Sequence, residues 1–288
     1  MHWNIEQILW TLVLTAHLIL LIVLLGRDRV GRFPWFTSAV GLSAVCLLAD
    51  HLLHGKLTTL AFYWQSYTGI ALQDIIGLAV LLELVRHVFF SRRTGLIVKP
   101  AGWIGWTLFL IAINAAAIWY FGPWPSWQAL HADPKQLPLL FVVLFAMKGQ
   151  LCIALFAVEV ALLLRIFGKR FGFGWRSHAQ QIALGLSTYA VGFLAVQVIT
   201  ESIKRTVHLT SREQYERIVH LFTNLDNARF ALWFLVLLWW IIWLWRDEPA
   251  VPSAFVLAEA EPVLAGPPPP LEAGIREADQ QGDPDARD

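Results

Sequence analysis

Seven stretches of this sequence are long and apolar enough to cross a lipid bilayer, and they constrain the fold more than any other feature. A helix needs about 20 residues to cross a hydrocarbon core about 30 Å thick. Charged residues make up only 15% of the chain, against about a quarter in soluble proteins. The stretches are residues 6–26, 34–54, 68–90, 101–121, 138–166, 179–203 and 225–245.

Helices are the expected form of these stretches. Lipid offers no hydrogen-bond partner to the backbone, so a spanning segment must satisfy its own N–H and C=O groups. The stretches also lack the alternation of apolar and polar residues that strands of a membrane barrel show. The sequence therefore predicts an all-α membrane protein, a seven-transmembrane-helix bundle with the lipid bilayer as its main partner.

Lysines and arginines predict the orientation of the bundle. Segments at one side of the seven stretches hold twelve of them, and segments at the other side hold six. Because cytoplasmic loops carry the excess of positive charge, we expect the N-terminus outside and the C-terminus in the cytoplasm. We place the chain in the cytoplasmic (inner) membrane as a multi-pass protein. Four of the six outer charges lie in residues 204–224, which predict an amphipathic or helical cap.

The end of the chain has a different composition from the rest. Residues 247–288 hold ten acidic residues, few large apolar ones and the run Pro267 to Pro270. Such a segment cannot bury enough surface to offset its ordering entropy. We predict a seven-helix transmembrane domain over 1–246 and a disordered, acidic, Pro-rich cytoplasmic tail over 247–288. A cytoplasmic protein partner could bind this tail. No motif indicates a nucleic-acid partner.

Four ionisable residues lie at one depth of the predicted bundle. At 1.5 Å per residue from the cytoplasmic helix ends, Asp50, Asp74, Lys148 and Arg229 all lie about 24–25 Å up. Facing lipid, each would cost at least about 2.5–3.5 kcal/mol. We therefore expect them to face the bundle interior or water, with Lys148 as the counter-ion of Asp50 or Asp74.

This layer predicts an outward-facing polar pocket. Lys148 and Arg229 would hold a carboxylate or phosphate, whereas the acids would hold a cation. A receptor-like or sensory protein that binds a small ligand from the outer side is the favoured function. A component of a solute or ion (proton-coupled) transporter is one alternative, and a structural ion-pair network that fixes helix register is another. The candidate ligand-binding residues are Asp50, His51, Asp74, Lys148, Glu201, Asp226 and Arg229.

A membrane-embedded metal-dependent hydrolase is a further alternative. Asp50, His51 and His54 supply metal-binding groups within five residues. On a helix, however, only Asp50 and His54 share a face, since His51 points about 100° away. Seven-helix zinc hydrolases use histidines of the last helix, where this chain has only His220, at the outer end. Asp50 and His54 are therefore weak metal candidates, and we assign no cofactor and no catalytic residue.

Seven helices, an outside N-terminus and the last-helix sequence "NLDNARFALWF" resemble the topology of microbial rhodopsins. That family attaches retinal to a lysine that follows an aspartate in the last helix. Here Asp226 is followed by Arg229, and residues 218–246 contain no lysine. Lys148 is the only lysine inside a predicted helix, and it lies on the fifth. The retinal function is therefore not carried over.

Other polar and aromatic residues predict structural roles. Glu83 precedes Arg86 and His87 by three and four residues, which predicts a charge clamp on one helical face. His17, at mid-depth, predicts a core residue, and it is the only ionisable connector for a proton path through the bundle. The five tryptophans of the last stretch predict lipid-facing bulk and an inner aromatic belt. They are Trp233, Trp239, Trp240, Trp243 and Trp245.

Overall fold

The computed structural model describes residues 5–89, 112–120, 124, 137–167, 177–206 and 211–247. Apart from Asp247, the predicted tail lies outside these ranges, as does most of the predicted span 101–121. The prediction that residues 247–288 form a disordered tail therefore stays a prediction.

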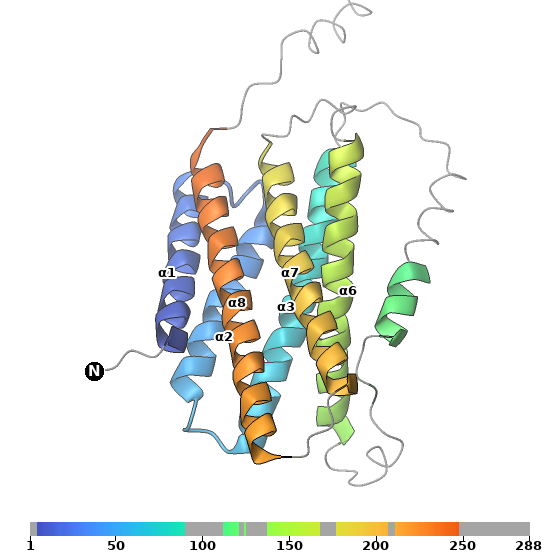
Figure 1. Cartoon of the computed structure of the whole chain (residues 1–288). Helices are drawn as coiled ribbons and strands as arrows, with labels where there is room; N and C mark the ends of the chain where they lie inside the picture. The colour runs from blue at the N-terminus through green and yellow to red at the C-terminus, as the bar shows by residue number, and fades with distance from the viewer. Residues whose placement is uncertain are drawn as a thin grey trace, which may run out of the picture. The chain divides into compact units, whose positions relative to one another are not determined.

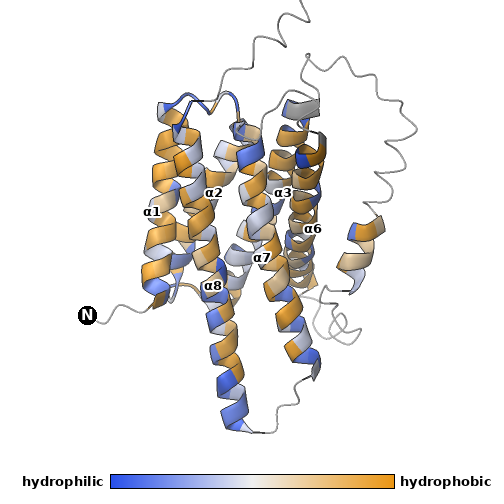
Figure 2. Ribbon diagram, turned by 45° about the horizontal axis from the view of Figure 1, so that its top comes forward, coloured by the Kyte–Doolittle hydropathy of each residue, from blue (hydrophilic) through white to orange (hydrophobic). Residues whose placement is uncertain are grey.

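The described chain is helical throughout and contains no strand. Six helices are long and apolar enough to cross a membrane, and their apolar lengths are orange in Figure 2. This confirms the all-helical prediction for the described residues. A seventh, short helix covers residues 112–120. The six are α1 (Ile5–Gly26), α2 (Pro34–Leu53), α3 (Thr59–Phe89), α6 (Leu137–Phe167), α7 (His178–Thr206) and α8 (Arg212–Trp245).

The six long helices form a closed ring in which each packs against its neighbours in the chain. The order around the ring is α1, α2, α3, α6, α7, α8, with α8 returning to α1 (Figure 1). A smaller contact between α3 and α7 crosses the middle of the ring. The main neighbours of α2 are therefore α1 and α3, a fact that decides which charged side chains can meet.

Two neighbouring pairs in the ring run in the same direction. His17 of α1 contacts Trp233 of α8, and Arg27, the residue after α1, contacts Trp245, so the two helices run in the same direction. A Cβ on Gly77 of α3 would lie 3.3 Å from Ile153 of α6, one turn beyond the contact between Asp74 and Gly149. α3 and α6 are therefore parallel, so that α3 ends and α6 begins at opposite ends of the bundle.

The short helix 112–120 runs in the direction opposite to α3 and α6. Asn114 donates a hydrogen bond to Glu159, and the carbonyl of Ile118 accepts one from Lys148, each at 2.8 Å. Moving forward along this helix therefore moves backward along α6. The described part of the connection is antiparallel to α6.

Glycines on α7 allow α8 to approach closely. Gly185 and Gly192 are seven residues apart and face Trp240 and Leu232, and a Cβ on either glycine would overlap the facing side chain. Small residues permit such close packing between membrane helices. The indole N–H of Trp240 donates to the carbonyl of Gln181 at 3.2 Å.

Three tryptophans of α8 make contacts inside the bundle, whereas the sequence predicted that they face lipid. Trp240 is 1% exposed and packs edge-on against Phe36 of α2, with ring centroids 5.0 Å apart. Trp233 donates to His17 at 3.4 Å, and Trp239 donates to Gln181. The prediction of lipid-facing bulk was wrong for Trp240, which is buried because its ring packs inside the bundle, whereas Trp233 and Trp239 are half-buried.

Glu83 caps a neighbouring helix instead of joining the predicted charge clamp. Its two carboxylate oxygens accept the backbone N–H groups of Trp35 and Phe36, at 3.2 and 3.1 Å. These are first-turn groups of α2, which no residue within that helix can pair. His87 is instead bonded by Arg32, at 3.3 Å. Glu83 therefore fixes α2 to α3.

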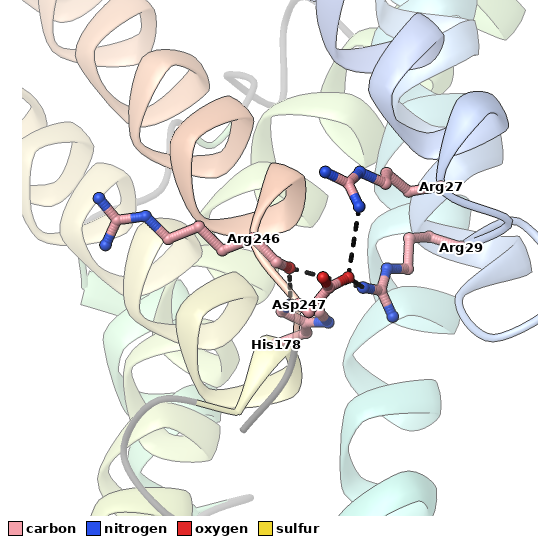
Figure 3. Close-up of polar contacts among 5 residues, drawn as sticks. All are labelled: Arg27, Arg29, His178, Arg246 and Asp247. Carbon is pink, nitrogen blue, oxygen red and sulfur yellow. Dashed lines mark hydrogen bonds and ion pairs between the residues drawn. The ribbon is translucent and has the colours of Figure 1, made fainter. Parts of the chain in front are cut away.

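Asp247 joins the ends of α1 and α8. Its carboxylate pairs with Arg27 at 3.3 Å and with Arg29 at 3.7 Å (Figure 3). Beside it, the His178 ring donates to the carbonyl of Arg246 at 3.1 Å. We call the end of the bundle where α1 begins the N-terminal end. The contacts of Asp247 and His178 lie at the other end, where α1 and α8 finish, which we call the opposite end.

The predicted cap over residues 204–224 is helical where the structure describes it. α7 continues to Thr206, and α8 begins at Arg212 after Ser211, whose hydroxyl accepts the N–H of Gln214. At 1.5 Å per residue α8 is about 50 Å long, well beyond a hydrocarbon core of about 30 Å. Its polar first turns, blue in Figure 2, lie outside the apolar length.

Candidate functional site

A groove opens at the N-terminal end of the bundle between α1, α2 and α8. Its volume is about 520 Å³. The polar residues that line it come from all three helices, so the groove exists only in the assembled bundle. They include Glu6 and Trp10 of α1, His51 and His54 of α2, and Asp226 and Asn227 of α8.

Aromatic contacts hold the two histidines of the groove. The Trp10 indole stacks on His51 with ring centroids 4.0 Å apart and an interplanar angle of 24°. The same indole donates its N–H to the carbonyl of Leu47 at 3.3 Å, which ties α1 to α2. His54 meets the Phe62 ring edge-on at 5.6 Å. The side of the groove formed by α1 and α2 is therefore aromatic, and its rings are held in place by contacts with one another.

The other charged groups of the groove are acids. Glu6 and Asp226 contribute carboxylates, and no lysine or arginine occurs among the described residues that line the groove. Arg229 lies just outside the lining, one turn along α8, and pairs with Asp226 at 3.3 Å. Carboxylates beside aromatic faces are the groups that attract an organic cation.

Asp50 is committed to α3 and does not reach Lys148. Its carboxylate accepts hydrogen bonds from Gln65 at 2.8 Å and from Ser66 at 3.1 Å. α2 packs mainly on α1 and α3, whereas Lys148 belongs to α6. The predicted pairing of Lys148 with Asp50 was wrong because depth in the membrane does not make two helices neighbours.

Lys148 turns toward the short helix and away from α3. Its ammonium donates to the carbonyl of Ile118 at 2.8 Å and lies 4.0 Å from the centre of the Trp124 ring. The next residue, Gly149, faces Asp74. Since consecutive helical residues differ by about 100°, Lys148 cannot share that face. The predicted pairing with Asp74 is therefore also absent from the described residues.

Asp74 is buried between α3 and α6. The residue is 8% exposed, and its Oδ2 atom has no hydrogen-bond partner among the described residues. A Cβ on Gly149 would overlap that same oxygen. The glycine therefore gives the carboxyl its space, but no described residue donates a hydrogen bond to that oxygen.

Glu201 stays on its own helix. It pairs with Lys204 at 3.0 Å, three residues further along α7. The nearby Arg205 donates to the hydroxyl and carbonyl oxygens of Tyr120, at 3.2 and 3.3 Å. Neither Glu201 nor Arg205 lines the groove.

The structure thus divides the predicted pocket residues into separate places. His51 and Asp226 line one groove, with Arg229 paired at its edge, while Asp50, Asp74, Lys148 and Glu201 each have surroundings of their own. Sequence reasoning missed Glu6 and Trp10. The sequence did show an acid and a tryptophan in the first two turns of an apolar helix. Their depth in the membrane, however, did not indicate that they lie beside α8.

Two other predicted roles find no support in the described contacts. No group of three or more His, Cys, Asp or Glu side chains within the described ranges could hold a metal ion. His17 is bonded on both ring nitrogens, since Nδ1 contacts the carbonyl of Val13 at 2.8 Å and Nε2 accepts from Trp233. This is the neutral imidazole of a core histidine, and it leaves no nitrogen for a proton relay.

Comparison with models of protein families, with curated proteins and with solved structures found no match.

Proposed function

We propose that the protein is a receptor-like membrane component that binds a small organic cation in the groove between α1, α2 and α8. The observation that carries the proposal is the lining, which contains the two carboxylates of Glu6 and Asp226 and the aromatic ring of Trp10, with no lysine or arginine among the described lining residues. A cation there would gain charge pairing from the acids and ring contact from Trp10. The volume suits a ligand of small-molecule size.

Thermal unfolding of the purified full chain in lipid nanodiscs tests this proposal. The probes are choline, spermidine and phenethylamine, with acetate and phosphate as anionic comparisons. We expect at least one cation to raise the melting temperature and the anions to have no effect. Glu6→Gln and Asp226→Asn should each reduce the shift.

Glu213→Gln is the matched control, because Glu213 is an exposed acid in the first turn of α8 and does not line the groove. It should retain the full shift. A shift that survives the double change Glu6→Gln and Asp226→Asn, or no shift with any cation, would reject the groove as a cation site.

We also propose that the bundle has seven spans, with the N-terminal end outside a cytoplasmic membrane. Two observations support an odd number of crossings: α1 begins and α8 ends at opposite ends of the bundle, and α3 and α6 are parallel. The excess of lysine and arginine at the opposite end supports a cytoplasmic location for that end.

Labelling of single cysteines in intact cells with a membrane-impermeant maleimide tests the topology, in a background where Cys46 and Cys152 are serine. Lys56→Cys and Pro138→Cys should react without permeabilisation. Gly31→Cys and Arg86→Cys should react only after it. Reaction of Arg86→Cys and Pro138→Cys from the same side would show that the segment between them does not cross.

A further inference from the structure

A row of polar residues runs along one side of α6, on the part of the bundle that the groove does not touch. Lys148 and Glu159 are eleven residues apart, about three helical turns, so they share a face. That face meets the short helix 112–120 through Ile118 and Asn114. Asp74 of α3 approaches the adjoining face of α6 at Gly149.

Two carboxyl groups, one on α6 and one facing α6 from α3, each have a buried oxygen with no hydrogen-bond partner in the described parts of the chain. One is Oδ2 of Asp74, a residue that is 8% exposed. The other is Oε2 of Glu159, whose second oxygen accepts from Asn114 at 2.8 Å. Gly149, which faces Asp74, and Glu159 are ten residues apart on α6, about 15 Å along the helix. The two carboxyl groups therefore lie at different levels along the same helix.

No cation in the described chain pairs with either acid. The nearest basic residue on α6 toward the N-terminal end, Lys148, is bonded to a backbone carbonyl. At the level of Asp74, α7 carries no titratable residue between Tyr189 and Glu201, and α2 carries none between Phe36 and Cys46. Cys152 is the titratable group of α6 that faces the same region. An ionised Asp74 would have no charge partner among the residues that the structure describes.

A carboxylate without donors is far more costly in an apolar interior than a neutral carboxylic acid. Ionisable groups inside membrane segments are also rare and commonly mark ion or proton pathways. For Asp74 the cost is not reduced by any donor among the described residues, and Gly149 brings the α6 backbone close to it. Binding of a proton removes the charge and needs no additional ligand.

We propose that Asp74 and Glu159 form an intramembrane proton-binding site along α6, with the two carboxyl groups at different levels and each holding its proton at neutral pH. This site is distinct from the groove between α1, α2 and α8, and it does not depend on the groove binding a cation. Gly149 is a positioning residue for it, since any side chain there would displace the Asp74 carboxyl.

Modification by dicyclohexylcarbodiimide tests the pair in the unaltered full chain. The reagent reacts with protonated carboxyl groups: the acid proton moves to a carbodiimide nitrogen while the carboxyl oxygen bonds to the central carbon. An exposed aspartate is protonated in only about one molecule in a thousand at neutral pH. We therefore expect peptide mass spectrometry to find Asp74 and Glu159 modified at least about tenfold more than Asp226 and Glu213.

Infrared spectroscopy provides a measurement that does not depend on access of the reagent. The carbonyl band of protonated carboxyl groups should lose intensity in Asp74→Asn and in Glu159→Gln, while Asp50→Asn leaves it unchanged because Asp50 has donors from two side chains. Losses in the ionised carboxylate band would overturn the proposal. Protection of Asp74 from modification by sodium chloride but not by choline chloride would also overturn it, by showing a metal cation in place of the proton.

Discussion

Two glycines on α7 and α6 make the same kind of contact with opposite results. Gly185 makes room for Trp240, and Gly149 makes room for Asp74. The indole N–H of Trp240 then donates to the carbonyl of Gln181. The Oδ2 atom of Asp74 reaches no donor among the described residues.

The presence or absence of a hydrogen-bond partner distinguishes a contact that serves helix packing from a candidate binding site. A buried polar group with its partner costs little, so the contact at Gly185 is explained by the close packing of α7 and α8. A buried polar group without one costs about 1–3 kcal/mol or more. Packing alone does not explain the unpartnered Asp74 carboxyl at Gly149, and this favours a role for Asp74 in binding a proton. Four variants test the contrast.

Gly185→Ala should have the largest effect. The new Cβ would overlap the Trp240 ring, which is 1% exposed and has no free space to enter. Overpacking of this kind costs about 1–3 kcal/mol, so thermal unfolding in nanodiscs should occur at a lower temperature. Gly41→Ala is the control, because a Cβ on this α2 glycine would meet nothing within 4 Å. Equal melting temperatures for the two variants would show that α8 can shift away from α7.

Gly149→Ala should destabilise the bundle through Asp74 specifically. If the overlap with the carboxyl is the cause, Asp74→Ala should remove most of the penalty in the double variant, with a coupling of about 0.5–3 kcal/mol. The measurement is a double-mutant cycle from thermal or denaturant unfolding. Strict additivity would mean that the two residues are not in contact.

Glu83→Gln should cost about 0.3–1 kcal/mol, the usual contribution of a negative charge at a helix N-terminus. The amide keeps one oxygen for Trp35 or Phe36 but loses the charge and the second acceptor. Unfolding measurements should show the loss, and it should diminish at high salt only weakly because the contact is partly buried. An unchanged stability would argue that water satisfies the first turn of α2.

Asp74→Asn should have the smallest effect on stability, because an amide has nearly the shape of a protonated acid and no hydrogen bond to a described residue is lost. Glu83 and Asp74 lie on the same helix, so the two carboxyl-to-amide changes form a matched pair. A loss for Asp74→Asn larger than that for Glu83→Gln would indicate a bond to the ionised Asp74 and would contradict the comparison.

The lengths of the helices could be predicted from the sequence, whereas the level and direction of each side chain could not. The 1.5 Å rise predicted one level for Asp50, Asp74, Lys148 and Arg229, but Asp50 bonds Gln65 and Ser66, which lie nine and eight residues before Asp74 on α3. The partners of these residues depend on the 100° turn per residue and on which helix stands at each angle. Lys148 and Gly149 differ by one residue, yet one faces the short helix and the other faces α3.

The positions of α1, α2, α6 and α7 agree closely with the predicted stretches, because apolar length alone marks where a helix can lie in lipid. α3 and α8 begin nine and thirteen residues before their predicted stretches, since polar turns outside the membrane continue a helix without an apolar signal. The groove was only partly foreseen: His51 and Asp226 were among the candidates, but Glu6 joins them only because α1 packs beside α8.

The sequence by itself determined that the chain is a bundle of apolar helices and that a few charges lie within it, because these follow from composition and rise per residue. Only the tertiary structure decided which charges meet. The order of helices around the ring gave Asp50 its donors from α3, gave Lys148 a backbone carbonyl, and left Asp74 facing a glycine. Neighbours in space come from packing between helices, and no spacing along one helix specifies them.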